Sequence, residues 1–226
     1  MALMTPPHVL LLTDMPAAAV DALVAHFADS ADPLPGVNGP ATCAAHFAKA
    51  YRELIGVHAQ PVMRYRVFRL DAVAAPLGLP GRLREATRAD RELLIGWSMA
   101  FTAEALPQEG PVDAARTGQL VDARLRRPGA QWLWEVDGEP VCTAVLSAPV
   151  AGVVRVSGVY TPPNRRGRGY ASACVAAVRQ HALDAGADAC MLYTDAANPV
   201  CNTIYQAIGY RPVGDTQEWR FAPGPQ

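Results

Sequence analysis

The stretch YTPPNRRGRGYA, from Tyr160 to Ala171, places three arginines and two glycines immediately before a helical pattern. The first N–H groups of a helix have no intrahelical acceptor, and the aligned peptide dipoles add about half a positive charge there. Because Gly167 and Gly169 lack a Cβ, the backbone can curl and a ligand can come close. These features together predict a backbone cradle for a diphosphate.

Two other interpretations of this turn stay open. It could be an arginine-rich solvated loop that closes into a helix. It could also be a dinucleotide-binding loop, although Ser172 stands where G-x-G-x-x-G requires its last glycine. Pro162 and Pro163 favour the cradle, because prolines cannot donate to a sheet ladder and the preceding strand therefore loses its neighbour at that end. An extended ligand that carries amides could pair with the exposed backbone.

A second stretch, ANPVCNTIYQAIGYRPV, runs from Ala197 to Val213. Pro199 at the first turn and Gly209 just past the end predict a short helix. Asn198 and Tyr205 are about two helical turns apart, so their side chains point roughly the same way. Taken alone, the asparagine could be a plain N-cap and the tyrosine a core aromatic.

The elements that must position these stretches fall into two segments. Residues 1–80 are expected to form a smaller α/β segment. In it we expect strands at His8–Thr13 and Val62–Leu70 and helices at Pro16–Ala28 and Ala41–Ile55. A loop is expected at Asp32–Pro40 and a linker at Ala74–Gly81. Residues 82–226 follow the order β, α, α, β, β, β, α, β, α, β, β, with a hairpin at Asp137-Gly138 and two closing strands at 210–214 and 218–221. This order predicts an α/β fold of the α+β type, with one mixed sheet whose first strands are antiparallel.

Composition narrows the class of protein. The formal net charge of the 226 residues is −1, so no global field favours nucleic acid. No apolar run reaches about 18 residues and the N-terminus has no signal-peptide pattern, so we expect a cytoplasmic protein without a membrane segment. The five cysteines show no C-x-x-C and are expected to be buried free thiols, while the histidines lack metal-ligand spacing, so no metal is expected.

The two stretches resemble the GNAT superfamily of acyl-CoA N-acyltransferases. Residues 166–171 match its R-x-x-G-x-[GA] signature. The second stretch is similar to its N-x-x-x-x-x-x-Y-x-x-x-G-[FY] segment, with Asn198, Tyr205, Gly209 and Tyr210 in register. One helix and one strand separate the two motifs, as the family requires. The resemblance covers about residues 82 to 221. The sequence of the second stretch is most similar to a subgroup of predicted bacterial acetyltransferases whose substrates are undefined.

The resemblance implies a GNAT-like fold with a splayed central sheet and acetyl-CoA as co-substrate. It implies that the diphosphate lies on the backbone of Arg166, Gly167, Arg168, Gly169, Tyr170 and Ala171. The backbone of Val159, Tyr160 and Thr161 would pair with the pantetheine arm and the acetyl carbonyl. Asn198 and Asn202 would face that arm, and Tyr205 would be the general acid.

The expected reaction is direct attack of a neutral amine on the thioester, so the amine must lose a proton. Some family members carry a glutamate base on the strand before the diphosphate loop, but residues 153–158 contain no carboxylate. Glu104, on a helical face with Trp97 and Phe101, is the best remaining candidate. Glu135 and Asp195 are weaker candidates, and a water relay to bulk solvent is equally compatible.

The acceptor cannot be read from the sequence beyond a small-molecule or peptide amine. A non-catalytic acyl-CoA-binding sensor or interaction module is the alternative function. Whichever function holds, residues 1–80 are expected to be a degenerate GNAT-like half or a lid over the acceptor side, and a homodimer is compatible with the pattern. The enzyme is favoured because Tyr205 is present, whereas the missing strand carboxylate favours the sensor.

Overall fold

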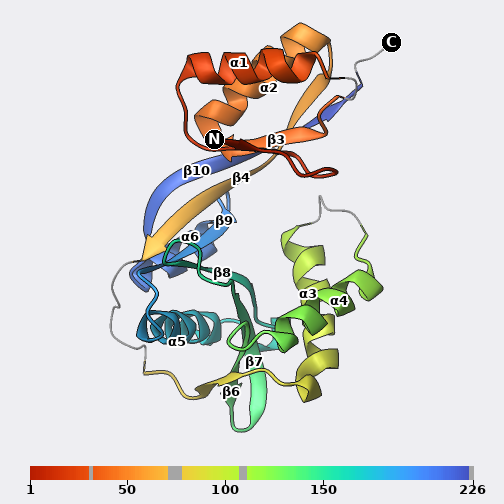
Figure 1. Cartoon of the computed structure of the whole chain (residues 1–226). Coiled ribbons are helices and arrows are strands. Elements are labelled where there is room, and N and C mark those ends of the chain that lie inside the picture. Colours follow the sequence, from red (N-terminus) through yellow and green to blue (C-terminus); the bar gives the residue numbers. More distant parts are fainter. Residues whose placement is uncertain (31–32, 71–77, 107–110, 224–226) are drawn as a thin grey trace. The chain divides into compact units, whose positions relative to one another are not determined.

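A computed structural model describes residues 1–30, 33–70, 78–106 and 111–223 (Figure 1). The chain forms two compact units. The first contains residues 1–67, 193–202 and 212–226, and the second contains residues 68–192 and 203–211. Two C-terminal segments therefore belong to the first unit, and a division into domains at residues 1–80 and 82–226 remains a prediction.

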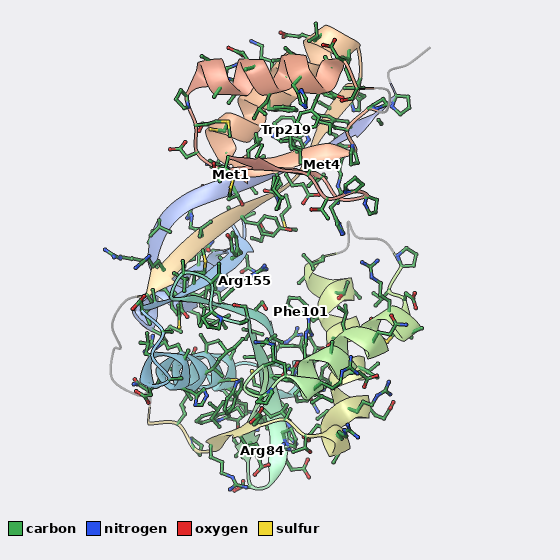
Figure 2. The ribbon with its side chains drawn as sticks, viewed as in Figure 1. Met1, Met4, Arg84, Phe101, Arg155 and Trp219 are labelled. Atoms are coloured by element: carbon green, nitrogen blue, oxygen red, sulfur yellow. The ribbon has the colours of Figure 1, made fainter. Side chains whose placement is uncertain are left out.

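The first unit is a sheet with two helices on one face. Its strands are β1 (Ala2–Leu3), β2 (Leu10–Leu12), β3 (Gly36–Pro40), β4 (His58–Leu70) and β10 (Arg211–Ala222), in the order β1-β2-β3-β10-β4. The helices are α1 (Ala17–Ala28) and α2 (Ala41–Ile55). They bury a core that includes Val20, Phe47 and Tyr51, against which Trp219 of β10 packs (Figure 2).

Two predicted elements of this unit were wrong. The loop expected at Asp32–Pro40 contains the strand β3, because its glycines serve close approach instead of a turn. A Cβ on Gly36 would lie 2.2 Å from the Trp219 carbonyl oxygen, and a Cβ on Gly39 would lie 2.8 Å from Leu12. The two closing strands are one continuous strand, β10, which pairs antiparallel with β3 from Thr216 to Arg220. Of the predicted linker at Ala74–Gly81, residues 74–77 lie outside the described residues, and residues 78–81 belong to no helix or strand.

The second unit contains the first predicted motif and residues 203–211 of the second motif. Its strands are β5 (Arg82–Glu85), β6 (Gln131–Val136), β7 (Glu139–Leu146), β8 (Val153–Tyr160) and most of β9 (Ala189–Asp195). Its helices are α3 (Arg91–Ala105), α4 (Ala114–Arg126), α5 (Tyr170–Asp184) and the second half of α6 (Pro199–Ala207). β5 to β8 are antiparallel, and β9 pairs parallel with β8. The predicted mixed α/β fold and the hairpin at Asp137-Gly138 are confirmed.

The central strands diverge, as the predicted splayed sheet requires. The parallel pairing of β8 with β9 ends at Arg155 and Met191, although β8 continues to Tyr160. On its other side β8 pairs with β7 as far as Tyr160 opposite Thr143. The last residues of β8 therefore carry backbone groups that β9 does not use.

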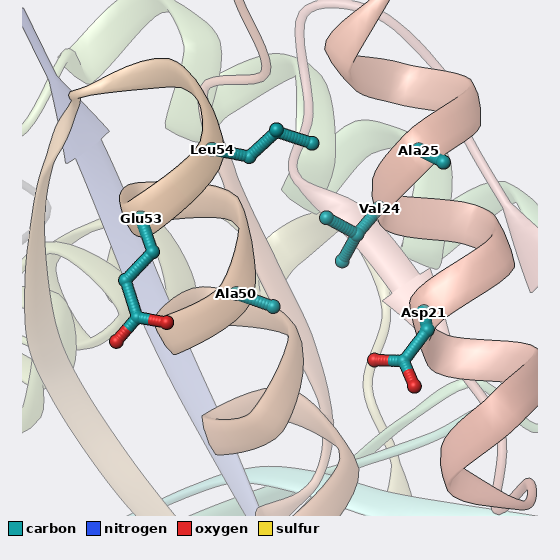
Figure 3. Close-up of a pocket in the computed structure, with 6 residues that line it drawn as sticks. All are labelled: Asp21, Val24, Ala25, Ala50, Glu53 and Leu54. Carbon is teal, nitrogen blue, oxygen red and sulfur yellow. The ribbon is translucent and has the colours of Figure 1, made fainter.

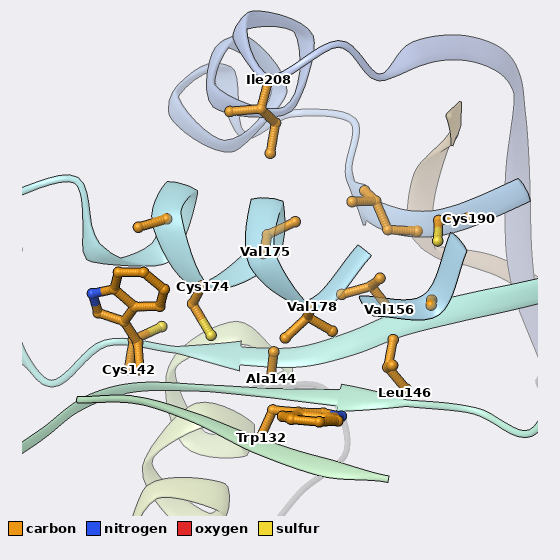
Figure 4. Packing of buried hydrophobic residues seen from close by; sticks show 14 of the residues in the cluster. Trp132, Cys142, Ala144, Leu146, Val156, Cys174, Val175, Val178, Cys190 and Ile208 are labelled. Atoms are coloured by element: carbon orange, nitrogen blue, oxygen red, sulfur yellow. The ribbon is translucent and has the colours of Figure 1, made fainter. Parts of the chain in front are cut away.

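Each face of this sheet has its own core. α5 packs Cys174, Val175 and Val178 against Cys142 and Trp132 of the sheet (Figure 4). Leu133 points to the opposite face, because side chains alternate along a strand, and it packs with Leu94 and Val121 of α3 and α4. The cysteines at 43, 142, 174 and 190 are buried and free. Within the described ranges, we find no helix of sufficient length and apolarity to span a membrane.

Candidate active site

The turn before α5 has an unusual backbone. After β8 the chain makes a short 3₁₀ turn at Pro163–Arg165, and α5 begins at Tyr170. Gly167 and Gly169 have φ angles of 74° and 78°, which L side chains rarely adopt. A Cβ on Gly167 would meet no atom within 4 Å, whereas one on Gly169 would lie 2.7 Å from Leu79 Cδ1. The space beside Gly167 is therefore open to a ligand.

One of the N–H groups expected to hold the diphosphate already has an acceptor within the protein. The N–H of Arg166 donates to the Pro163 carbonyl at 3.3 Å, so the 3₁₀ turn already uses it. The Ala173 N–H donates to the Gly169 carbonyl at 3.0 Å and starts the ladder of α5. N–H groups ahead of that bond point out of the helix start, where the dipole favours an anion. The backbone of residues 167–172 thus has the form of an anion cradle.

The end of β8 carries a β-bulge. Tyr160 lies opposite Thr143 and Ser157 lies opposite Val145, so β8 uses one more residue than β7 over this interval. Gly158 has a φ of 55° within it. A bulge re-aims the backbone and bends its strand. It places Gly158 and Val159 together opposite Ala144, on the segment expected to face the donor's acetyl carbonyl.

Three side chains meet at this strand end, and one of them, that of Glu104, comes from a distant part of the sequence. Glu104, near the end of α3, accepts from the Tyr160 hydroxyl at 3.1 Å and from Arg166 Nη2 at 2.6 Å. The Arg166 guanidinium also lies 5.6 Å from the Tyr160 ring centroid. Its Nε donates to the Thr161 carbonyl at 2.9 Å. Arg166 therefore ties α3 to the end of β8, and it occupies the Thr161 oxygen expected to pair with pantetheine.

Tyr160 is the buried member of this group. Its ring lies 6.2 Å from that of Trp97 on α3. Burial raises the pKa of the Tyr160 phenol, and its hydrogen bond to the Glu104 carboxylate raises it further. The phenol therefore stays protonated at neutral pH and acts as a donor to Glu104. Glu104 itself is about half-exposed, with 44% of its side chain accessible, so solvent or an acceptor can still reach it.

Tyr205 lies on α6 as predicted and is half-buried. Its ring centroid is 6.1 Å from that of Phe68 and 6.1 Å from that of Tyr210. These contacts fix the plane of the ring at the edge of the core that lies under α5. The packing is compatible both with a core aromatic and with a positioned acid.

The two asparagines of the second motif lie in the first unit. Asn202 is buried, and its Nδ2 donates to the carbonyls of Asp195 and Ala196 at 3.4 and 3.2 Å. Its Oδ1 is buried and has no hydrogen-bond partner among the described residues. Asn198 accepts the Asn202 N–H through its carbonyl at 3.2 Å. Asn202 thus holds the turn from β9 into α6 and retains one unused acceptor.

The weaker carboxylate candidates have structural partners. Glu135 is bound by Arg82 at 2.7 Å and by Arg84 at 2.6 Å, and these hydrogen bonds lower the pKa of its carboxyl group. Asp195 accepts the Ala197 N–H at 2.8 Å. Both carboxylates are therefore already used to hold the fold. Among the described residues, no group of three or more histidine, cysteine or acidic side chains could hold a metal.

The described pocket on the first unit is of a different kind. It is a shallow groove between α1 and α2, with Asp21 and Glu53 on its sides and Val24, Ala25, Ala50 and Leu54 between them (Figure 3). Asp21 also pairs with His46 at 2.8 Å. No residue of either motif lines this groove.

The link from Glu104 to Arg166 is the feature that sequence reasoning missed. The two residues are 62 positions apart, and no periodicity relates a helix end to a later turn. Each residue was marked separately in the sequence, since Arg166 is the first residue of the glycine motif and Glu104 shares a helical face with Trp97. Neither mark indicates that the two side chains meet.

Comparison with known proteins agrees with this architecture. Residues 94–210 match the model of a family described as the Acetyltransferase (GNAT) family. Among curated proteins, none matches this chain.

Solved structures share the fold at low sequence identity. A GCN5-related N-acetyltransferase from Kribbella flavida is 21% identical with a TM-score of 0.60, and the match covers 95% of this chain and 81% of that one. One from Sphaerobacter thermophilus is 19% identical with a TM-score of 0.62, covering 84% and 61%. An acetyltransferase from Colwellia psychrerythraea is 11% identical with a TM-score of 0.65, covering 91% and 72%. At these identities the likeness establishes the fold alone.

Proposed function

Because this chain belongs to the acetyltransferase (GNAT) family, we propose that it moves an acetyl group from acetyl-CoA to a primary amine by direct attack. The observation that carries the proposal is the turn at residues 167–169. Two left-handed glycines open directly into the 15-residue helix α5, and the space beside Gly167 is open. Hydrogen bonds from backbone N–H groups to an ionised oxygen contribute roughly 1.5–3 kcal/mol each, so several of them could anchor a diphosphate without side chains.

In this proposal the end of β8 aligns the thioester. Its unpaired backbone would take the pantetheine amides, as in β-strand addition. A backbone N–H in the bulge near Val159 would stabilise the oxyanion that forms when the amine adds to the carbonyl. Arg166 uses one of the two lone pairs of the Thr161 carbonyl, so both become available to the donor when Arg166 releases it. We therefore expect the guanidinium to turn toward the diphosphate when the donor binds, since the two charges are opposite.

That movement would also free Glu104. In this structure its carboxylate faces the Arg166 cation and the Tyr160 hydroxyl. Without the cation it would be free to accept a proton from the acceptor ammonium, which is mostly charged at neutral pH. Trp97 and Phe101 on the same helix would line the acceptor side. Tyr205 would return a proton to the departing CoA thiolate.

A panel of primary amines tests this proposal. The release of CoA thiol from acetyl-CoA is followed with each amine, while calorimetry measures acetyl-CoA binding without an acceptor. We expect binding in the micromolar range and amine-dependent thiol release. We also propose a cytoplasmic location for the protein, where the buried cysteines would stay reduced. Binding with no release for any amine would favour the acyl-CoA sensor, and absence of binding would contradict both functions.

A further inference from the structure

Arg179 is a buried cation that the proposed mechanism does not use. It lies on α5 and is only 1% exposed, as one of the largest fully buried side chains of the protein. Burial lowers the pKa of its guanidinium. A buried charge costs stability unless polar partners compensate for it. The position of those partners therefore indicates what the residue does.

One partner lies at the end of α6. Arg179 Nη1 donates to the carbonyl of Ile208, immediately after the last residue of that helix. The C-terminal end of a helix carries a partial negative charge from its unsatisfied carbonyls, so a cation is favourable there. Arg179 therefore joins the middle of α5 to the C-terminal end of α6.

The end of α6 is a Schellman motif in which Tyr205 holds a defined position. The Tyr210 N–H donates to the Tyr205 carbonyl at 3.0 Å, and the Gly209 N–H donates to the Gln206 carbonyl at 3.0 Å. Gly209 has the left-handed φ, 96°, that this motif needs. The accompanying contact between the first and last residues is the Tyr205–Tyr210 ring pair. The motif satisfies the carbonyls of residues 205 and 206, and Arg179 satisfies that of Ile208.

The same helix begins at the diphosphate turn. Arg179 lies nine residues after Tyr170, which is about 14 Å along α5. One rigid helix thus spans from the proposed donor cradle to the motif that carries the proposed acid. Misplacement of a catalytic group by about 1 Å can cost about 100-fold in rate.

We propose that Arg179 is a positioning residue for Tyr205, which it holds at a fixed height relative to the donor turn through the Ile208 carbonyl. The kinetic consequence of this role rests on the proposed function. The structural consequence does not, because the orientation of the Tyr205 ring can be measured without turnover.

The kinetic test uses Arg179→Met, which keeps side-chain length and removes the cation. We expect kcat to fall about tenfold or more while the Kd for acetyl-CoA stays within about twofold. Arg179→Lys should recover part of the loss. In a Tyr205→Phe background, Arg179→Met should cause no further loss, because both changes act on one group. Arg124→Met, which removes a half-buried arginine of α4, is the control and should leave kcat unchanged.

Two results would overturn the role. One is an equal loss from Arg179→Met with and without the Tyr205 hydroxyl, and the other is a raised Kd with unchanged kcat. If Arg179→Met does not fold, the same double-mutant cycle with Tyr205→Phe is measured with Arg179→Lys. Fluorotyrosine labelling separates this from failure of the proposed function. The Tyr205 fluorine resonance, assigned by its absence in Tyr205→Phe, should shift and broaden in Arg179→Lys but not in Arg124→Met, and an unchanged resonance would contradict the positioning role.

Discussion

The proposed donor side and the proposed acceptor side of the candidate site are built in different ways. The donor turn is a run of neighbouring residues, and its properties come from the backbone angles of Gly167 and Gly169 and from the start of α5. The acceptor side is assembled from side chains of α3, β8 and the following turn, through the Glu104, Tyr160 and Arg166 contacts. Backbone geometry is local in sequence and can be read from a short motif, whereas a side-chain cluster depends on how distant elements pack.

Removal of the Tyr205 hydroxyl should have the largest effect. Tyr205→Phe keeps the ring contacts with Phe68 and Tyr210, so acetyl-CoA affinity should be unchanged. We expect kcat to fall about 100-fold, because the leaving thiolate loses its positioned proton donor. Steady-state kinetics with the best acceptor measures this. Tyr51→Phe removes a hydroxyl that accepts the Leu34 N–H in the first unit, and it serves as control. If kcat is retained, Tyr205 is a packing residue.

Glu104→Gln should have a smaller effect and tests the acceptor side directly. The amide keeps the shape of the side chain but cannot accept a proton, so we expect kcat/KM to fall about tenfold. Glu92→Gln is the control, since Glu92 lies on the same helix with 83% of its side chain exposed and pairs with Arg91. An unchanged kcat/KM would assign proton removal to a water relay.

The smallest effect concerns how α3 itself is held. Asp90 accepts from Arg84 at 2.8 Å and from the Thr87 N–H at 2.8 Å (the Arg84 side chain is labelled in Figure 2). The Arg84 hydrogen bond is the main reason that the Asp90 pKa falls from 3.8 to about 2. Because the folded pKa is the lower one, the stabilisation is complete above about pH 4 and is lost as the pH falls toward 2.

Urea unfolding at pH 7 should show Asp90→Asn less stable by about 1–2 kcal/mol. The difference from the unmodified protein should shrink as the pH falls through this window. Asp122→Asn, which removes a more exposed partner of Arg91, should cost less. A pH-independent difference would show that the charge of Asp90 does not stabilise α3.

The fold of the second unit could be read largely from the sequence, because its signals are local. The Asp137-Gly138 turn, the helix start at Tyr170 and the helix end at Gly209 each follow from residues within one turn. β3 could not be predicted, since its glycines match a loop and only the nearby Trp219 and Leu12 show why they are glycines. The sequence predicted that the backbone of Arg166 belongs to the turn before α5. It could not predict the side-chain contact of Arg166 with Glu104, because that contact depends on tertiary packing.

Gly167 is a better position than Gly169 at which to test the proposed donor turn. A substitution at Gly169 would clash with Leu79 whatever its charge, so it cannot separate strain from ligand repulsion. Gly167 has the same left-handed angle but open space around it. Asparagine and aspartate both tolerate this region and have nearly the same shape. Gly167→Asp and Gly167→Asn therefore differ chiefly in charge.

Calorimetric titration of these two variants with acetyl-CoA tests the central claim, that the donor's diphosphate lies on this turn. We predict that Gly167→Asn weakens binding only a few-fold and that Gly167→Asp weakens it at least about tenfold more, because a carboxylate would face the diphosphate. Equal affinities for the two variants would contradict the claim and place the diphosphate elsewhere.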